Sequence, residues 1–440
     1  MSSAHEPHLP DGPTKASGAN IWMLVYIFGL IFIQGLMVNH ISVLLPVLKQ
    51  SLGLNEQQIG MVSSLAFTGA LPALFLSGYV TEFIGPKLSG GVAVVFTGAG
   101  CLIMGSATYW TVMAGILILH FGFNWILSVH SAVITTYYPH SRQRLFFLAM
   151  AMLAVGAIIG PPAIGKAIEE VGLNSWGKVY IATGLTVWIL FGLLCLVCGR
   201  HISELGRRKA PSDTRHSASP LSRLDKATRF RQMFTSGIFN QPALYLLGVI
   251  VILDNLALVN VVSWTGFLAE QRFEAKTDEI GYLTSLMAIG VLTGRIVMAS
   301  FFSGRISDRK LLGFAYGLSM LFFIAMLFSQ TFFLLRISYF MMAFFMSAQS
   351  ATTYAIGADK FKERAAAGIP IVDGIGSLGA IAAPLIVGSV AMKIGLVQAL
   401  WLVPIFGFML TFVCLAWEWA DKHSAPRSTH QLPNGPDASA

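Results

Sequence analysis

Long apolar stretches separated by short polar segments recur along the chain from residue 21 to residue 420. Each is about 18 residues or longer, close to the length that an α-helix needs to cross the hydrocarbon core of a bilayer. Gly, Pro, Asn and charged residues lie between the stretches. The pattern predicts twelve membrane-spanning helices, at residues 21–46, 58–80, 88–108, 111–136, 144–171, 177–199, 241–268, 279–303, 311–328, 332–356, 365–392 and 396–420.

One long polar segment, residues 200–232, is rich in Arg, Ser and Pro and divides the predicted helices into two groups of six. The chain is therefore predicted to be an all-α membrane protein built from two six-helix bundles. Its predicted parts are an N-terminal tail at 1–20, an N-terminal bundle at 21–199, a linker at 200–240, a C-terminal bundle at 241–420 and a C-terminal tail at 421–440.

Composition excludes a water-soluble fold. Only 11% of the 440 residues are charged, whereas soluble domains carry roughly 25%. Nearly all the charged residues fall in loops or at helix ends, and the exceptions are Asp254, Arg295, Arg336 and Asp373. Arg336 is near enough to a helix end for its side chain to reach the membrane surface.

The distribution of Lys and Arg predicts the orientation. Most of the 29 basic residues lie on one side of the membrane if both termini face the cytoplasm, as the positive-inside rule requires. We therefore expect a multi-pass protein of the inner cell membrane with both termini cytoplasmic. This bias accounts for the net charge of +8, so no nucleic-acid partner is expected.

The two halves repeat the same pattern of small and polar residues. Asn39 and Ser42 match Asn260 and Ser263 at an offset of 221 residues. Further matches, at offsets between 217 and 226, are Ile59-Gly60 with Ile280-Gly281, Gly78 and Glu82 with Gly304 and Asp308, Thr135-Thr136-Tyr137 with Thr352-Thr353-Tyr354, and Gly156, Pro161, Gly165 and Gly172 with Gly379, Pro384, Gly388 and Gly395. Such constant offsets predict a duplicated, pseudo-symmetric six-helix unit.

The loop after the second predicted helix resembles a signature of the major facilitator superfamily, and the resemblance extends from residue 21 to residue 420. Glu82 stands in place of the usual Asp, Phe83 and Pro86 stand where basic residues are common, and the second copy lacks the later glycine. The resemblance implies gating roles for Gly78, Glu82, Gly85, Lys87, Gly304, Asp308 and Arg309. The same residues would also suit ordinary capped turns, because glycine permits tight turns and charges stabilise helix ends.

The fifth predicted helix contains a glycine-proline run similar to a family signature first noted in exporters. Small residues let helices approach closely, and proline bends a span. We therefore assign helix packing to Gly156, Gly160, Pro161, Gly165, Gly379, Pro384 and Gly388. Exporters often carry an arginine about where this chain has His120, which counts against drug/proton exchange.

The few polar side chains inside the predicted spans are the candidates for a solute site between the halves. The candidate binding residues are Asn39, His40, His120, Asn124, Asn255, Asn260, Trp264, Arg295, Gln349 and Tyr354, and Gln34, His130 and Tyr339 are further polar residues of the same helices. The candidate proton-coupling residues are Asp254, Asp373 and His40, because a buried carboxylate is costly unless paired or protonated and imidazole titrates near neutral pH.

Several alternatives stay open at this point. A neighbouring hydroxyl or amide could hold Asp254 in a purely structural role. Arg295 could pair with Asp373 or contact an anionic solute, and Trp264 could be an interfacial anchor.

These observations predict a secondary active transporter that moves a small polar organic solute by alternating access, in proton-coupled symport. The segment from Gly69 to Gly85, with Pro72-Ala73, resembles the fucose/proton symporter group, although that group's acids in helices one and four are absent here. The alternatives are a proton-coupled efflux antiporter for drugs or metabolites, and a carboxylate or anion transporter using Arg295.

No Walker loop, metal-binding spacing or nucleophile motif occurs in the sequence. We therefore expect no enzymatic activity, no cofactor and no metal. The expected partners are the solute, protons and the lipid bilayer, and the expected state is a monomer.

Overall fold

The computed structural model describes residues 18–138, 141–207, 238–302, 305–361 and 365–424. Every regular element in these ranges is a helix. The first half contains α1 (Gly18–Met37), α2 (His40–Leu52), α3 (Glu56–Met104), α4 (Tyr109–Tyr137), α5 (Arg142–Val171), the short 3-10 helix η1 (Leu173–Ser175) and α6 (Trp176–Arg207). The second half contains η3 (Ile238–Asn240), α8 (Pro242–Phe273), α9 (Thr277–Phe301), α10 (Asp308–Leu327), α11 (Phe332–Met346), α12 (Gln349–Phe361), α13 (Ala365–Ile394), α14 (Leu396–Ala399) and α15 (Leu402–Ser424).

The predicted all-α membrane fold is confirmed. In the described part of the chain, eleven segments are long and apolar enough to span a bilayer. The predicted helix at 58–80 lies in the first limb of α3, which turns at Gly85 (φ 80°, ψ 162°) before its second limb. Glycine adopts this positive φ without the steric cost that a side chain would add.

Three predicted continuous helices are interrupted. The first is split into α1 and α2 at Val38 and Asn39, the tenth into α11 and α12 at Ser347 and Ala348, and the twelfth into α14 and α15 at Leu400 and Trp401. Asn39 has left-handed backbone angles (φ 59°, ψ 7°), which Asn tolerates better than most residues. A tight turn keeps the Val38 N–H bonded to the Gly35 carbonyl, 3.1 Å away, and such breaks at membrane depth require enclosure by protein.

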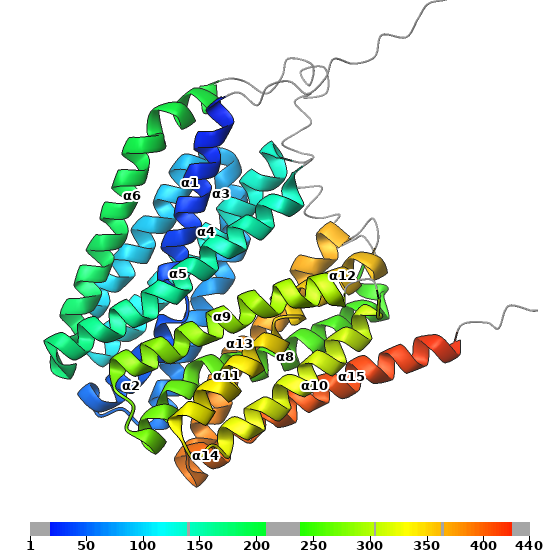
Figure 1. Cartoon of the computed structure of the whole chain (residues 1–440). Coiled ribbons are helices and arrows are strands. Elements are labelled where there is room, and N and C mark those ends of the chain that lie inside the picture. The colour runs from blue at the N-terminus through cyan, green and yellow to red at the C-terminus, as the bar shows by residue number, and fades with distance from the viewer. Residues whose placement is uncertain (1–17, 139–140, 208–237, 303–304, 362–364, 425–440) are drawn as a thin grey trace, which may run out of the picture.

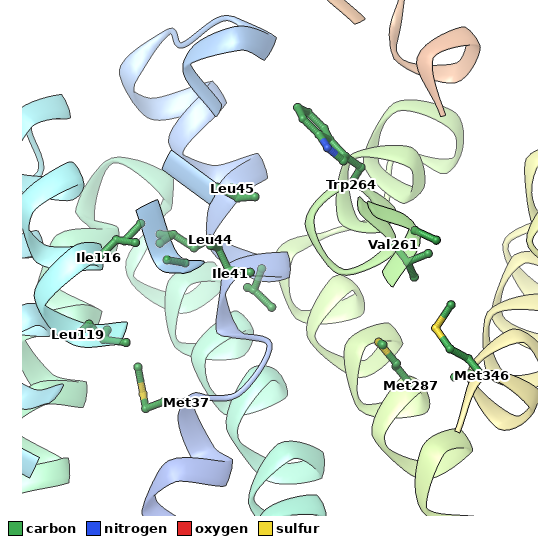
Figure 2. Close-up of a cluster of buried hydrophobic side chains, with 14 of the residues drawn as sticks. Met37, Ile41, Leu44, Leu45, Ile116, Leu119, Val261, Trp264, Met287 and Met346 are labelled. Carbon is green, nitrogen blue, oxygen red and sulfur yellow. The ribbon is translucent and has the colours of Figure 1, made fainter. Parts of the chain in front are cut away.

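The two halves approach each other at one end and diverge toward the other (Figure 1). We call the end where α1 begins and α15 ends the terminal side, and the opposite end the distal side. The halves meet where α5 packs on α9, α3 on α13 and α2 on α8. The apolar core crosses this contact, with residues from both halves in one buried cluster (Figure 2): Met37, Ile41, Leu44, Leu45, Ile116 and Leu119 from the first half, and Val261, Trp264, Met287 and Met346 from the second.

Repeat-related glycines make the same contact at two helix pairs that join the halves, α5 with α9 and α3 with α13. A methyl group on Gly281 would lie 2.7 Å from the Pro161 carbonyl oxygen, and one on Gly60 would collide with the Pro384 carbonyl oxygen. The two glycines are 221 residues apart and the two prolines 223. The pseudo-twofold relation read from the sequence is therefore present in the packing of the distal side.

Candidate functional site

Several serine hydroxyls form hydrogen bonds between the two halves at the distal side, and we call this contact between the halves the distal seam. Ser63 and Ser263 share a hydrogen bond of 2.7 Å between their hydroxyl oxygens. The Ser64 hydroxyl donates to the Ile381 carbonyl at 2.6 Å, and the Ser285 hydroxyl to the Ile158 carbonyl at 2.7 Å. Ser42 donates to the Val262 carbonyl and Gln50 to Glu270, also across the seam.

These seam residues were not among the predicted site residues. Ser42 and Ser263 were visible only as a repeat-related pair. Ser64 and Ser285 are also 221 residues apart, and their acceptors Ile158 and Ile381 are 223 apart. Repeat spacing was thus the signal that could have identified the seam.

The acceptor of Ser285 is a carbonyl that the helix itself leaves unbonded. In an α-helix the N–H of residue i bonds to the carbonyl of residue i−4, and Pro162 has no N–H to donate to Ile158. Residue 385, at the repeat-related position of the second half, is Leu, so the Ile381 carbonyl keeps its helical partner. The two serine hydrogen bonds therefore occupy equivalent positions, but loss of the Ser285 bond would leave its acceptor carbonyl unpaired, whereas loss of the Ser64 bond would not.

A buried polar cluster lies in the first half, beside the break in the first helix. The His40 Nδ1 lies 2.9 Å from the Tyr180 hydroxyl, and its Nε2 lies 3.4 Å from the Nε2 of His120. His40 and Tyr180 are fully buried. Asn124 donates to the His120 carbonyl and Gln34 to the Phe123 carbonyl. Two imidazoles and a phenol are thus brought together from α2, α4 and α6.

Asp254 lies near the middle of α8 and is 3% exposed. The Tyr316 hydroxyl donates to the Asp254 backbone carbonyl at 3.2 Å. The carboxylate oxygen Oδ1 has no hydrogen-bond partner among the described residues. The neighbouring Asn255 donates to the Gly376 carbonyl at 3.0 Å.

The side chains of Asn260 and Trp264 form their hydrogen bonds within α8. The Asn260 amide donates to the Leu256 carbonyl of its own helix, and the Trp264 indole donates to the Asn260 Oδ1 at 3.2 Å. Both side chains are buried. Asn39, its repeat partner, instead occupies the helix break, so the two amides differ in local structure.

A second polar group lies toward the terminal side of the C-terminal half. The Tyr354 hydroxyl donates to the Asp373 Oδ2 at 3.1 Å, and Arg295 donates to the Ser350 hydroxyl at 3.4 Å. Tyr354 is 44% exposed. Among the ion pairs of the described residues, none joins Arg295 to Asp373.

The remaining polar candidates are dispersed. Gln349 begins α12 directly after the helix break. Tyr339 donates to the Met287 sulfur at 3.2 Å. His130 is buried with its ring against Phe146, their centroids 5.9 Å apart. These three residues belong to neither polar group.

The expected gating residues have different surroundings. Gly85 forms the turn in α3, and the Lys87 carbonyl accepts a 2.9 Å hydrogen bond from the Tyr26 hydroxyl. Of Gly78 and Glu82 only the helical backbone is described, and Gly304 lies outside the described residues. Asp308 is the first residue of α10.

Arg309 joins an ionic network that was not predicted. It pairs with Glu418 at 3.1 Å and with Asp421, and Lys360 pairs with Asp421 at 2.7 Å. The guanidinium also lies 5.3 Å from the Trp417 ring centroid. The network ties α10 and α12 to the end of α15, within one half.

The predicted packing residues lie at close helix contacts of two kinds. A methyl group on Gly156 would lie 2.6 Å from the Phe32 carbonyl oxygen, and one on Gly379 would lie 2.5 Å from that of Ile252, both within a half. Gly160 likewise faces Leu36. Gly165 and Gly388 face the opposite half, where added methyl groups would lie 2.5 Å from the Thr277 and 2.6 Å from the Glu56 carbonyl oxygens.

Glu56 also forms an ion pair with Lys49 at the distal side, and this pair shifts the pKa of the Glu56 carboxyl group. The Lys49 Nζ lies 2.6 Å from its Oε1, and this hydrogen bond holds the pKa of Glu56 below its usual value. Among the described residues, no group of three or more His, Cys, Asp or Glu side chains could hold a metal ion.

Comparison with known proteins gives matches over most of the chain. A family model described as the Major Facilitator Superfamily matches residues 27–274 and 245–436. The uncharacterized MFS-type transporter YcaD of Salmonella heidelberg (strain SL476) is 28% identical over 200 residues, 45% of this chain and 48% of the relative. The chain thus spans about half the length of the curated relatives it matches.

Two solved structures have a similar fold. A bacterial homolog of the human lysosomal transporter Spinster, in an inward-facing and occupied conformation, gives a TM-score of 0.66 at 13% identity, covering 92% of this chain and 98% of that one. The transporter FucP in the outward conformation gives 0.57 at 16% identity, covering 91% and 99%.

Proposed function

This chain belongs to the major facilitator superfamily, and from that premise we propose that it carries a small polar organic solute across the membrane in symport with protons. It is a secondary transporter, so it works by exposing one site alternately to each side. We propose that it is a monomer of the inner cell membrane. The basic residues at the terminal side support a cytoplasmic location for both termini.

The observation that carries proton coupling is the burial of Asp254 with one carboxylate oxygen unpaired among the described residues. Its side chain is 3% exposed, and one carboxylate oxygen has no partner in the described part of the chain. An unpaired charge in such a place costs several kcal/mol. The carboxyl group is therefore best suited to hold a proton in this state and to release it when the site opens to water. We assign the same kind of role to His40 and Asp373.

The distal seam supports alternating access. Serine bonds and glycine contacts close the distal side between the halves, and they must separate for a solute to pass there. With the termini in the cytoplasm, the described state is inward-facing. Solute binding is assigned to polar residues on either side of the interface: Asn39, His40, His120 and Asn124 in the first half, and Asn255, Arg295, Gln349 and Tyr354 in the second.

A second candidate function is transport of a carboxylate or another anion. Arg295 is half-buried, donates to Ser350, and is in none of the ion pairs of the described residues. A guanidinium with donors to spare suits a carboxylate. The direction of transport, import or efflux, is a separate alternative that the same experiment resolves.

The test uses purified protein in proteoliposomes without ATP. Radiolabelled sugars, nucleosides, amino acids and carboxylates are offered under an inward proton gradient, with and without a protonophore. Symport predicts accumulation above the outside concentration that the protonophore abolishes. Accumulation only with an outward gradient would instead indicate efflux. If the Arg295→Gln variant still transports neutral solutes but no longer transports anions, the result would indicate the anion function.

A further inference from the structure

A groove of about 730 Å³ lies on the outer surface of the bundle, where α5, α9 and α11 meet. Its walls are mostly apolar, and Ile159, Tyr282 and Ile337 in them are 48%, 53% and 43% exposed. All three helices are membrane spans or parts of spans. Lipid is therefore the medium that fills this groove.

The groove is built from both halves of the protein. Ile158 belongs to α5 and Ser285 to α9, and both line it. These are the two residues joined by the seam hydrogen bond of 2.7 Å. An occupant would thus contact both halves at once, in the state where the distal side is closed.

Its depth matches one leaflet of a bilayer. Arg336 lies a little more than one turn from the start of α11, at the distal side. From Thr277 at the start of α9 to Ile289 in the groove the helix advances about 18 Å, and half of a hydrocarbon core is about 15 Å. The groove therefore runs from headgroup depth to near the middle of the bilayer.

One cation stands at the headgroup end. The Arg336 guanidinium lies 4.0 Å from the Phe332 ring centroid and 3.6 Å from the Glu279 carboxylate. It is 37% exposed at the side chain. A guanidinium carries five N–H donors, so most of them are available to an oxygen ligand, and its planar fork suits phosphate.

We propose that a phospholipid of the distal leaflet occupies this groove, with its phosphate on Arg336 and one acyl chain along the seam between α5 and α9. The bound lipid stabilises the state in which the distal side is closed, because the groove needs both halves to be in contact. The inference rests on the fold and not on the proposed solute or coupling ion.

The test measures retained lipid by native mass spectrometry of the full chain, purified with dioleoylphosphatidylglycerol or with dioleoylglycerol, which has the same chains but no phosphate. Wild type should retain more dioleoylphosphatidylglycerol than dioleoylglycerol. Arg336→Gln should weaken that retention about tenfold, the effect of one charge-assisted hydrogen bond. The control Lys166→Gln removes an exposed cation of the distal side, 66% exposed and outside the groove, and should change nothing.

A second pair of variants tests the apolar part without touching a charge. Ile337→Trp fills the groove and should reduce retention of the phospholipid, whereas Leu318→Trp, on exposed surface of α10, should not. Equal retention of both lipids by wild type, or unchanged retention in both Arg336→Gln and Ile337→Trp, would overturn the proposal.

Discussion

Replacing Ser285 with alanine removes a hydroxyl that lies 2.7 Å from the Ile158 carbonyl oxygen of the opposite half. That carbonyl has no helical donor, because Pro162 stands four residues later. In the variant it is left without a partner while the distal side is closed. The change is one oxygen atom, so the packing of the buried Ser285 site is otherwise retained.

The expected magnitude follows from the cost of an unpaired carbonyl. A net intramolecular hydrogen bond contributes about 0.5–1.5 kcal/mol, and a buried group left unsatisfied costs about 1–3 kcal/mol. Hydrogen bonds between membrane helices average about 0.6 and reach about 1.7 kcal/mol. We take about 1–1.5 kcal/mol, which lowers the ratio of closed to open distal side about five- to twelvefold.

Ser64→Ala is the matched control. Its acceptor, the Ile381 carbonyl, retains the helical N–H of Leu385 and so loses only its second partner. The shift should therefore be smaller than that of Ser285→Ala, although the two serines occupy repeat-related positions.

The assay is a pulsed electron–electron resonance distance measurement across the distal side, with spin labels at Lys178 in the first half and Lys393 in the second. The longer-distance population should grow in Ser285→Ala and much less in Ser64→Ala. An unchanged distribution in Ser285→Ala, or the larger shift in Ser64→Ala, would refute the role assigned to Pro162.

Three further predictions concern other contacts. Gly281→Ala places a methyl 2.7 Å from the Pro161 carbonyl oxygen and should open the distal side at a cost of about 1–3 kcal/mol; Gly192→Ala, with nothing within 4 Å, should leave the same spin-label distances unchanged. Asp254→Asn should abolish gradient-driven accumulation in proteoliposomes while solute exchange continues, and intact gradient dependence would refute its role. Glu56→Gln should slightly lower the thermal midpoint at pH 7, because the lowered pKa of Glu56 gives stability that is present above the unfolded pKa of about 4.3 and is lost as pH falls through the folded pKa. The thermal midpoints of wild type and variant should therefore converge as the pH is lowered below the folded pKa, and a difference that stays constant with pH would contradict this.

The sequence predicted the helices and the repeat because both depend on spacing alone. Runs of about 20 apolar residues define spans whatever their partners are, and constant offsets identified Gly60 with Gly281 as equivalent positions. The helix break at Asn39 was missed because one residue in a left-handed conformation leaves the hydropathy of the stretch unchanged. Asn260 at the matching position is helical, so repeat spacing relates positions but does not determine their backbone conformation.

The polar contacts were harder to predict than the positions. Asp254 stood out as a rare acid in a span, yet nothing local indicated whether a hydroxyl would reach its carboxylate. The seam serines are small polar residues of a kind common in membrane helices, and only the fold shows that Ser285 meets the carbonyl freed by Pro162. The partners of Arg309 lie more than 100 residues away, at Glu418 and Asp421, a distance over which spacing gives no information.

Proton-coupled transport is tested most directly by recording solute uptake and internal pH together in proteoliposomes that contain the purified protein and no ATP. With an inward proton gradient, wild type should accumulate its solute above the outside concentration while solute addition speeds acidification of the lumen, and Asp254→Asn should do neither. Uptake that stops at the outside concentration, with internal pH unaffected by the solute, would contradict the account.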